Sequence, residues 1–398
     1  MVALAGVLSA CSGVPVQSTD AGALLDSSLY VGAPPCEAPN GESLETIGDR
    51  FSPASTQVYT SSMLWRARAT PSGGVIVLHT THPTSVEGSL ACTHVVSSFD
   101  GSGHLGWSRE IASLDPCFPQ AADFVFETAG IEVAGIDLEG RTSSRWRATI
   151  ALDGTLITGR TVEEVIDDLG VMRLSGLAAV PESGSEAAAI YFIRDGDLLV
   201  TRGIDDEHRI FSLGDDGYRI SATRSDDGRS TCIVVRHRQT GRLSLLRLAG
   251  DIVMSNELVL EAGASFNPVP IASSERCIVP YFAPDETHPT AGSVRVFGAA
   301  DTSILGWRGV APLGLAMVGE NRLALAAPDP EWPGQIDVWW IEPSPGRCSV
   351  PSAALVTTVA DYGGPLGSVQ AVATDDGPRV ILGGLTGVGE VAIARPAR

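Results

Sequence analysis

Thr81-His82-Pro83-Thr84 recurs in this chain as Thr287-His288-Pro289-Thr290, 206 positions later. Two tripeptides recur in the same way. Leu105-Gly106-Trp107 returns 200 positions later as Leu305-Gly306-Trp307, and Asp226-Asp227-Gly228 returns 149 positions later as Asp375-Asp376-Gly377. These distances are close to multiples of about 50 residues, a length typical of a four-stranded β-unit that is copied around a ring. The spacing therefore predicts an all-β fold, a single β-propeller.

Short apolar runs, separated by pairs that end in glycine, fill the chain from about residue 55. Glycine takes the positive φ that a tight hairpin needs, so these pairs predict turns between strands. The predicted turns are Glu139-Gly140, Asp153-Gly154, Asp195-Gly196, Asp227-Gly228, Thr240-Gly241 and Asp376-Gly377. The innermost strands then start near Met63, Ala122, Met172, Tyr218, Ser265, Pro312 and Leu366. These starts predict seven four-stranded blades, with six or eight blades as the alternatives.

The last repeat has room for only three strands before Arg398. An open edge strand invites pairing with other chains, so a propeller ring has to close. We expect Ser55 to Thr60 to supply the missing outer strand. The propeller would then span residues 51–398.

Thr161 to Leu169 departs from the β pattern, because Val162, Val165, Ile166 and Leu169 share one helical face. Thr161 and Glu164 have the spacing of a capping box, which marks a helix start. A short helix is predicted here, and a β-strand is the competing interpretation.

The first eleven residues are mostly small and apolar, as in a secretory signal. Leu8-Ser9-Ala10-Cys11 resembles the lipobox of bacterial lipoproteins, which implies that Cys11 carries lipid and anchors the chain to a bilayer. No Arg precedes the apolar run and the run is short, so we expect the true start to lie upstream of Met1. Residues 12–50 are rich in Ser, Gly, Pro and acidic residues, a composition typical of a flexible tether. The expected location is the bacterial cell envelope, at the outer membrane or cell surface.

The net charge of −20 argues against nucleic-acid binding, because an acidic surface repels phosphate backbones. The sequence contains no dinucleotide fingerprint, phosphate loop or metalloprotease motif, and no cofactor is expected. We expect a monomer.

If Cys11 is lipidated, six cysteines remain: Cys36, Cys92, Cys117, Cys232, Cys277 and Cys348. An even number in an exported protein permits disulfides, although the pairing does not follow from the sequence. Cys232 and Cys277 each precede Ile-Val at matching positions of consecutive repeats. They are either a disulfide or two buried thiols.

The two Thr-His-Pro-Thr motifs are predicted to lie between the second and third strands of their repeats. These loops leave a propeller on the same face as the links between blades, and loops on a rigid scaffold often carry function. His82, Thr84, His288 and Thr290, together with Trp332, are therefore the candidate binding residues. The alternative interpretation is that Pro and Thr recur because they shape the turn.

His79, His82 and His94 fall in one predicted hairpin near Cys92. Neutral imidazoles bind metals, but this spacing matches no familiar closed zinc site. No metal site is predicted.

Trp107 and Trp307 occupy matching outer-strand positions, and Asp100 to Gly103 leads into the first of them. This stretch resembles the repeat of bacterial quinoprotein-like propellers. The resemblance implies that these tryptophans pack between blades. It is local, and we carry no quinone cofactor over from it.

The sequence lacks a Gly-x-Ser-x-Gly elbow, and its adjacent acidic pairs, such as Asp205-Asp206, Asp215-Asp216 and Asp226-Asp227, are expected in solvated turns. It therefore favours a non-catalytic binding or scaffold module that engages a protein or glycan through its loop face. The alternative is a carbohydrate-active hydrolase or lyase with carboxylates at the central channel. Whether the chain is an enzyme stays open, with the balance against it.

Overall fold

The computed structural model describes residues 51–55 and 61–282 with short gaps, and beyond residue 291 it describes the strands. The gaps within 61–282 are 71, 82–91, 102–103, 115–118, 129, 168–172, 183–187, 204–205, 215–216 and 261–267. Side chains are described between Leu64 and Tyr281 and at Gln370, Val372 and Ile381. The described part of the chain contains no helix, and hence no helix that could cross a membrane.

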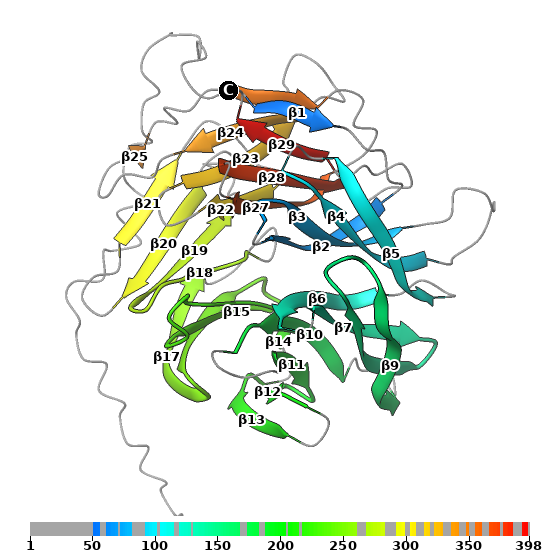
Figure 1. Ribbon diagram of the computed structural model, residues 1–398. Helices are drawn as coiled ribbons and strands as arrows, with labels where there is room; N and C mark the ends of the chain where they lie inside the picture. Colours follow the sequence, from blue (N-terminus) through cyan, green and yellow to red (C-terminus); the bar gives the residue numbers. More distant parts are fainter. Residues whose placement is uncertain are drawn as a thin grey trace, which may run out of the picture. The chain divides into compact units, whose positions relative to one another are not determined.

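The described strands form seven sheets, which we number along the chain (Figure 1). The first sheet holds β2 (Ser61–Ala69), β3 (Val75–Thr81), β4 (Cys92–Phe99) and β5 (Leu105–Leu114). The second holds β6 (Pro119–Glu127), β7 (Gly130–Glu139), β8 (Thr142–Ile150) and β9 (Leu156–Asp167). The third holds β10 (Leu174–Val180), β11 (Ala189–Arg194), β12 (Asp197–Thr201) and β13 (Glu207–Ser212). The fourth holds β14 (Gly217–Arg224), β15 (Thr231–His237), β16 (Leu243–Ala249) and β17 (Ile252–Leu260).

The remaining sheets follow the same antiparallel order, with two additions from elsewhere in the chain. The fifth holds β18 (Ile271–Ala272), β19 (Arg276–Phe282), β20 (Gly292–Gly298) and β21 (Ser303–Trp307), and β25 (Cys348–Ser349) pairs in parallel with β21. The sixth holds β22 (Gly314–Val318), β23 (Arg322–Pro328), β24 (Ile336–Ile341) and β26 (Leu355–Val359). The seventh holds β27 (Leu366–Thr374), β28 (Gly377–Gly384), β29 (Ala392–Pro396) and β1 (Phe51–Ser55).

The innermost strands contact one another in sequence, which makes this a β-propeller with four-stranded blades. β2 contacts β6, β6 contacts β10, β10 contacts β14, and β14 contacts β18. β22 contacts both β19 and β27, and β27 contacts β2. Neighbouring strands of a sheet run antiparallel. The link into the innermost strand and the connection between the second and third strands therefore leave each sheet at the same end. We call this end the loop face and the other end the turn face.

The seventh sheet takes its outer strand from the N-terminal end of the described region, but from an earlier segment than predicted. β1 pairs antiparallel with β29 and places Phe51 opposite Pro396. The closing strand is Phe51–Ser55 and precedes the predicted segment, of which residues 56–60 lie outside the described residues. Closure removes one exposed edge of the ring, which would otherwise pair with other chains.

The conformation of the glycine-containing turns explains why the strand boundaries could be predicted from the sequence. Asp195 and Gly196 have φ values of 51° and 78°, as a two-residue primed turn requires. The glycines of four further predicted turns also have positive φ: Gly140, Gly154, Gly228 and Gly241. Six innermost strands begin within a few residues of the predicted positions. The exception is β18, which begins at Ile271 rather than near Ser265.

The predicted helix at Thr161 to Leu169 is wrong. Residues up to Asp167 belong to β9, the outer strand of the second sheet, whereas 168–172 lie outside the described residues. Bulges in the pairing with β8 interrupt the two-residue alternation and produced the helical spacing of the apolar residues. Val162 and Val165 are 42% and 62% exposed, so these apolar side chains are not buried as one face of a packed helix would be.

The core lies between adjacent sheets. Between the first and second sheets, Leu78, Phe124 and Ile131 pack with the fully buried Trp146. Trp107 packs against this cluster and donates a hydrogen bond from Nε1 to the Leu152 carbonyl, 3.1 Å away in the turn between β8 and β9. The prediction that Trp107 packs between blades is confirmed. Only the backbone of Trp307 is described.

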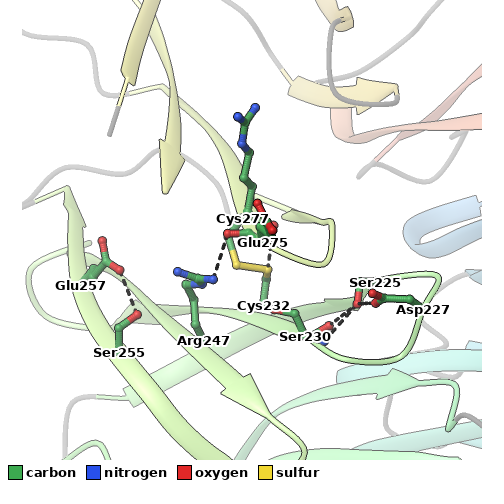
Figure 2. Close-up of a disulfide and its surroundings, with 10 residues drawn as sticks. Ser225, Asp227, Ser230, Cys232, Arg247, Ser255, Glu257, Glu275 and Cys277 are labelled. Atoms are coloured by element: carbon green, nitrogen blue, oxygen red, sulfur yellow. Dashed lines mark hydrogen bonds between the residues drawn. A yellow bond between two sulfur atoms is a disulfide. The ribbon is translucent and has the colours of Figure 1, made fainter. Parts of the chain in front are cut away.

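Cys232 and Cys277 form a disulfide between β15 and β19, the second strands of two neighbouring sheets (Figure 2). The matching positions of these cysteines left open whether they form a disulfide or two buried thiols, and the structure shows the disulfide. Beside the disulfide, Arg247 Nη2 donates a hydrogen bond to the Glu275 carbonyl at 3.0 Å. The Cys232–Cys277 disulfide thus joins the fourth and fifth sheets covalently. Cys92 is also disulfide-bonded.

Candidate functional site

The predicted site residues Cys11, His82, Thr84, His288, Thr290 and Trp332 all lie outside the described residues. The strand order nevertheless fixes which connections carry the loop residues. The first Thr-His-Pro-Thr motif runs from the end of β3 into the connection to β4, and the second lies between β19 and β20. Trp332 lies between β23 and β24. Each is a connection between the second and third strands of a sheet, as predicted for the two motifs, and each belongs to the loop face.

The buried Arg66 and the partly buried Arg68, both on β2, meet one carboxylate where the innermost strands converge. Arg66 Nε lies 3.5 Å from Asp123 Oδ1, and Arg68 Nη2 lies 3.4 Å from the same oxygen. Asp123 Oδ1 also accepts the Phe124 amide at 2.7 Å, and Oδ2 accepts the Ala179 amide at 3.0 Å. Burial lowers the pKa of Arg68 to about 10, which leaves the side chain protonated at neutral pH. Asp123 therefore holds the innermost strands β2, β6 and β10 together.

The same arginines donate to backbone carbonyls of other sheets. Arg66 Nη2 donates to the Ala222 carbonyl of β14 at 3.1 Å, and Arg68 Nη2 donates to the Ala179 carbonyl of β10 at 2.7 Å. On the other side of β2, Gln370 of β27 accepts the Ala67 amide and donates to the Trp65 carbonyl, both at 2.7 Å. The axis is thus bridged by polar side chains from several sheets. Among the described residues this differs from the cluster of carboxylates that the hydrolase or lyase alternative places at the channel.

A chain of hydrogen bonds crosses from the first sheet to the second with the order found in hydrolase triads. Trp65 Nε1 donates to Thr80 Oγ1 at 2.7 Å, and Thr80 Oγ1 lies 3.3 Å from His94 Nδ1. His94 Nε2 donates to Asp137 Oδ1 at 3.0 Å. A hydroxyl, an imidazole and a carboxylate in series form the arrangement that activates a nucleophile. Here Thr80, His94 and Asp137 are all 0% exposed, so a substrate cannot reach the hydroxyl and the series joins two sheets instead.

The two described histidines of the predicted hairpin, His79 and His94, hydrogen-bond to different side chains. His79 Nε2 lies 2.9 Å from Ser97 Oγ, and burial with the nearby His94 lowers the pKa of His79 to about 4. His82 lies outside the described residues, and Cys92 is disulfide-bonded. Within the described ranges, no group of three His, Cys, Asp or Glu side chains is placed to hold a metal ion.

One pair of carboxylates lies near the turn-face end of the second sheet. Glu127 is the last residue of β6, and Glu132 follows on β7. Burial and the neighbouring Glu132 raise the pKa of Glu127 to about 7, while the Ala188 amide donates to its Oε1 at 2.6 Å. Arg147 Nη1 lies 2.5 Å from Glu132 Oε1. Glu127 has the proton affinity expected of an acid–base group near neutral pH.

Three arginines gather around Tyr218 at the loop face of the fourth sheet. Arg219 on β14 lies directly across from Arg236 on β15. The Arg219 and Arg238 guanidinium carbons lie 5.2 and 5.4 Å from the centre of the Tyr218 ring. None of the three arginines forms an ion pair with any side chain that the structure describes. Sequence reasoning missed this group, although Tyr218-Arg219 and Arg236-His237-Arg238 place basic residues at two neighbouring strand ends.

The acidic pairs behave as expected where they are described. Asp227 lies in the turn between β14 and β15, and its Oδ1 accepts the Ser225 hydroxyl at 2.7 Å and the Arg229 amide at 3.1 Å. These bonds lower the pKa of Asp227. Asp205, Asp215 and Asp216 lie outside the described residues.

Comparison with known proteins gives a fold and no family. No protein-family model and no curated protein matches the chain. The propeller domain of Cps50 (Swd1) from Myceliophteria thermophila is similar over 88% of this chain and 100% of its own, with a TM-score of 0.52 and 10% identity. The hydrazine synthase of Kuenenia stuttgartiensis is similar over 86% of this chain and 98% of its own, with a TM-score of 0.51 and 12% identity. At such identities the likeness shows the β-propeller fold alone.

Proposed function

We propose that this chain is a non-catalytic binding or scaffold propeller that engages a protein or glycan through its loop face. The proposal rests on the buried polar side chains, whose hydrogen bonds hold parts of the fold together. Asp123 ties innermost strands together at the axis, and Thr80, His94 and Asp137 are sealed between two sheets. We assign recognition to the connections at the loop face, because loops on a rigid scaffold commonly bind partners.

We also propose that the propeller is complete with seven blades and stands on the bacterial envelope, at the outer membrane or cell surface. In this arrangement Cys11 carries the lipid, residues 12–50 form the tether and residues 51–398 form the ring. The disulfide between Cys232 and Cys277 supports an exported protein, because disulfides persist in oxidising compartments. Metabolic labelling with a palmitate analogue tests the anchor: the wild type should be labelled and the Cys11→Ser variant should not.

Binding of the full chain to purified envelope polysaccharide and envelope protein fractions tests the function. The triple variant His82→Ala, His288→Ala, Trp332→Ala changes three loop-face connections and should weaken binding by about tenfold or more. His104→Ala is the matched control, since His104 is 69% exposed in the β4–β5 connection at the turn face. Equal binding by the wild type and the triple variant would contradict a loop-face site.

The alternative function, a carbohydrate-active hydrolase or lyase, is favoured by one observation. Glu127 and Glu132 form a carboxylate pair in which the pKa of Glu127 is raised to about 7. Release of reducing ends from a panel of envelope polysaccharides would reveal such an activity, and Glu127→Gln should abolish it. Turnover that is lost in Glu127→Gln would replace the binding proposal with the enzyme. We expect no turnover.

A further inference from the structure

We propose that Arg219, Arg236 and Arg238 form an anion-binding site at the loop face of the fourth sheet. Its ligand would be an oxyanion with two negative charges, of the phosphate or sulfate type. This inference rests on the proposed function, because it names a chemical group that the loop face would recognise.

Repulsion between the arginines is the first argument. Arg219 and Arg236 are directly opposite on antiparallel strands, where like charges destabilise the pairing. Arg238 lies two positions after Arg236, directly after the last residue of β15. Burial and the neighbouring Arg219 lower the pKa of Arg236. The folded chain therefore holds these charges together at a cost, which an anion between them would offset.

The second argument is an unmet donor. Arg219 Nε is buried and has no hydrogen-bond partner among the described residues. Buried polar groups almost always have a partner, and an unpaired one is costly. An oxyanion bound to this guanidinium supplies the missing acceptor.

The third argument concerns geometry and charge. Arg219 and Arg238 both lie over the Tyr218 ring, which restricts their guanidinium planes before a ligand arrives. The guanidinium fork suits the paired oxygens of phosphate, sulfate and carboxylate groups. Three positive charges favour a dianion over a single carboxylate. The chain as a whole has net charge −20, so this local positive charge is not a general property of its surface.

Isothermal titration of the full chain with inorganic phosphate, sulfate and acetate tests the site. Phosphate and sulfate should bind about tenfold more tightly than acetate. The double variant Arg219→Gln, Arg238→Gln should lose about tenfold or more of the phosphate affinity. Arg229→Gln is the matched control, because Arg229 is 82% exposed beside Asp227 in the β14–β15 turn at the opposite end of the same sheet. If acetate binds as tightly as phosphate, or if the double variant binds phosphate as the wild type does, the proposal is wrong.

The single variant Arg238→Lys keeps the test decisive if the double variant does not fold. Arg238 is exposed, and lysine retains the charge but loses the fork, so phosphate affinity should fall while the melting temperature stays unchanged. Unaltered phosphate binding in this variant would also count against the site.

The chain's own Asp215 and Asp216 provide the competing explanation. If they already neutralise the arginines, the wild type will bind no phosphate and the variant Asp215→Asn, Asp216→Asn will bind it. That outcome overturns the proposal of an external ligand.

A sulfated oligosaccharide and its unsulfated parent separate a polymer-borne anion from a free ion. Tighter binding of the sulfated compound than of inorganic sulfate identifies the polymer as the source, and equal binding identifies the free ion. Failures of the two proposals are distinguishable. If the arginine double variant keeps full binding to the envelope fraction and the triple loop variant does not, the function stands and the anion site falls. If phosphate binds but neither envelope fraction does, the anion site stands and the function falls.

Discussion

Two regions of this propeller place a pair of arginines around one aromatic ring, with opposite electrostatic surroundings. Arg145 and Arg194 lie 4.3 and 5.9 Å from the centre of the Phe192 ring, where the second and third sheets meet. Arg219 and Arg238 lie at comparable distances from Tyr218 in the fourth sheet. Both regions combine one aromatic ring with two arginines, but they differ in whether carboxylates lie beside those arginines.

Around Phe192 each arginine has glutamates beside it. Arg145 Nη1 lies 3.0 Å from Glu163, Arg194 Nη1 lies 2.7 Å from Glu164, and Glu207 contacts both arginines. Around Tyr218 no described carboxylate contacts any of the three arginines. The first group stabilises an interface between sheets, whereas the second retains the capacity to bind an anion. The same residue type therefore serves structure or recognition according to its counter-charge.

Removing the arginines paired with one glutamate should have the largest effect. The variant Arg145→Gln, Arg147→Gln removes both arginines that contact Glu163, whose side chain is 8% exposed, and breaking a buried pair from one side costs about 3–5 kcal/mol. Urea unfolding should show this loss, with Arg209→Gln as an exposed control. A loss of under about 1 kcal/mol would mean that Glu163 is as well solvated as a surface group.

The fourth sheet should instead depend on its covalent link. The variant Cys232→Ser, Cys277→Ser opens a loop of 45 residues and should lower the free energy of unfolding by about 2–4 kcal/mol. The reduced wild type should lose at least as much stability, because reduction also opens the disulfide of Cys92. Unchanged stability in both would show that packing alone holds the fourth sheet against the fifth.

His79 tests how unfavourable a positive charge is in the buried part of the first sheet. Burial lowers the pKa of His79 from 6.5 to about 4, so the folded state binds fewer protons than the unfolded state between these values. Its contribution is complete above pH 6.5 and is lost as pH falls to about 4, by about 3 kcal/mol. Unfolding measured across this range should be less pH-dependent in His79→Gln. An identical pH profile in the two proteins would show that His79 is not the group responsible.

Removing one unpaired arginine should have the smallest effect and the opposite sign. Arg236→Gln relieves repulsion with Arg219 and should raise the free energy of unfolding by about 0.2–1 kcal/mol at low salt. The gain should shrink at high salt, because screening weakens exposed charge interactions. Destabilisation by Arg236→Gln would indicate that Arg236 has a counter-charge within the folded chain.

The architecture could be predicted because turn chemistry is local. Asp195-Gly196 and similar pairs mark hairpins by the φ that glycine allows, and their spacing revealed the repeat. Thr161 to Asp167 failed because bulges in an outer strand gave apolar residues a helical spacing. The matching positions of Cys232 and Cys277 were visible, but only the distance between strands decided between a bond and two thiols.

The contacts between sheets were beyond sequence reasoning because they join residues far apart in the chain. Arg66 meets the Ala222 carbonyl, 156 positions away, and Asp137 meets His94, 43 positions away. Arg66 and Arg68 alternate in an innermost strand, and that signal could have indicated a polar axis. It does not indicate which carbonyls the arginines would find.

The most direct test of the account is a crystal structure of the full chain grown with sulfate. The account predicts a sulfate oxygen within hydrogen-bond distance of Arg219 Nε, with Arg236 and Arg238 against the same ion and none of these residues in a lattice contact. A carboxylate of Asp215 or Asp216 in that position would contradict it.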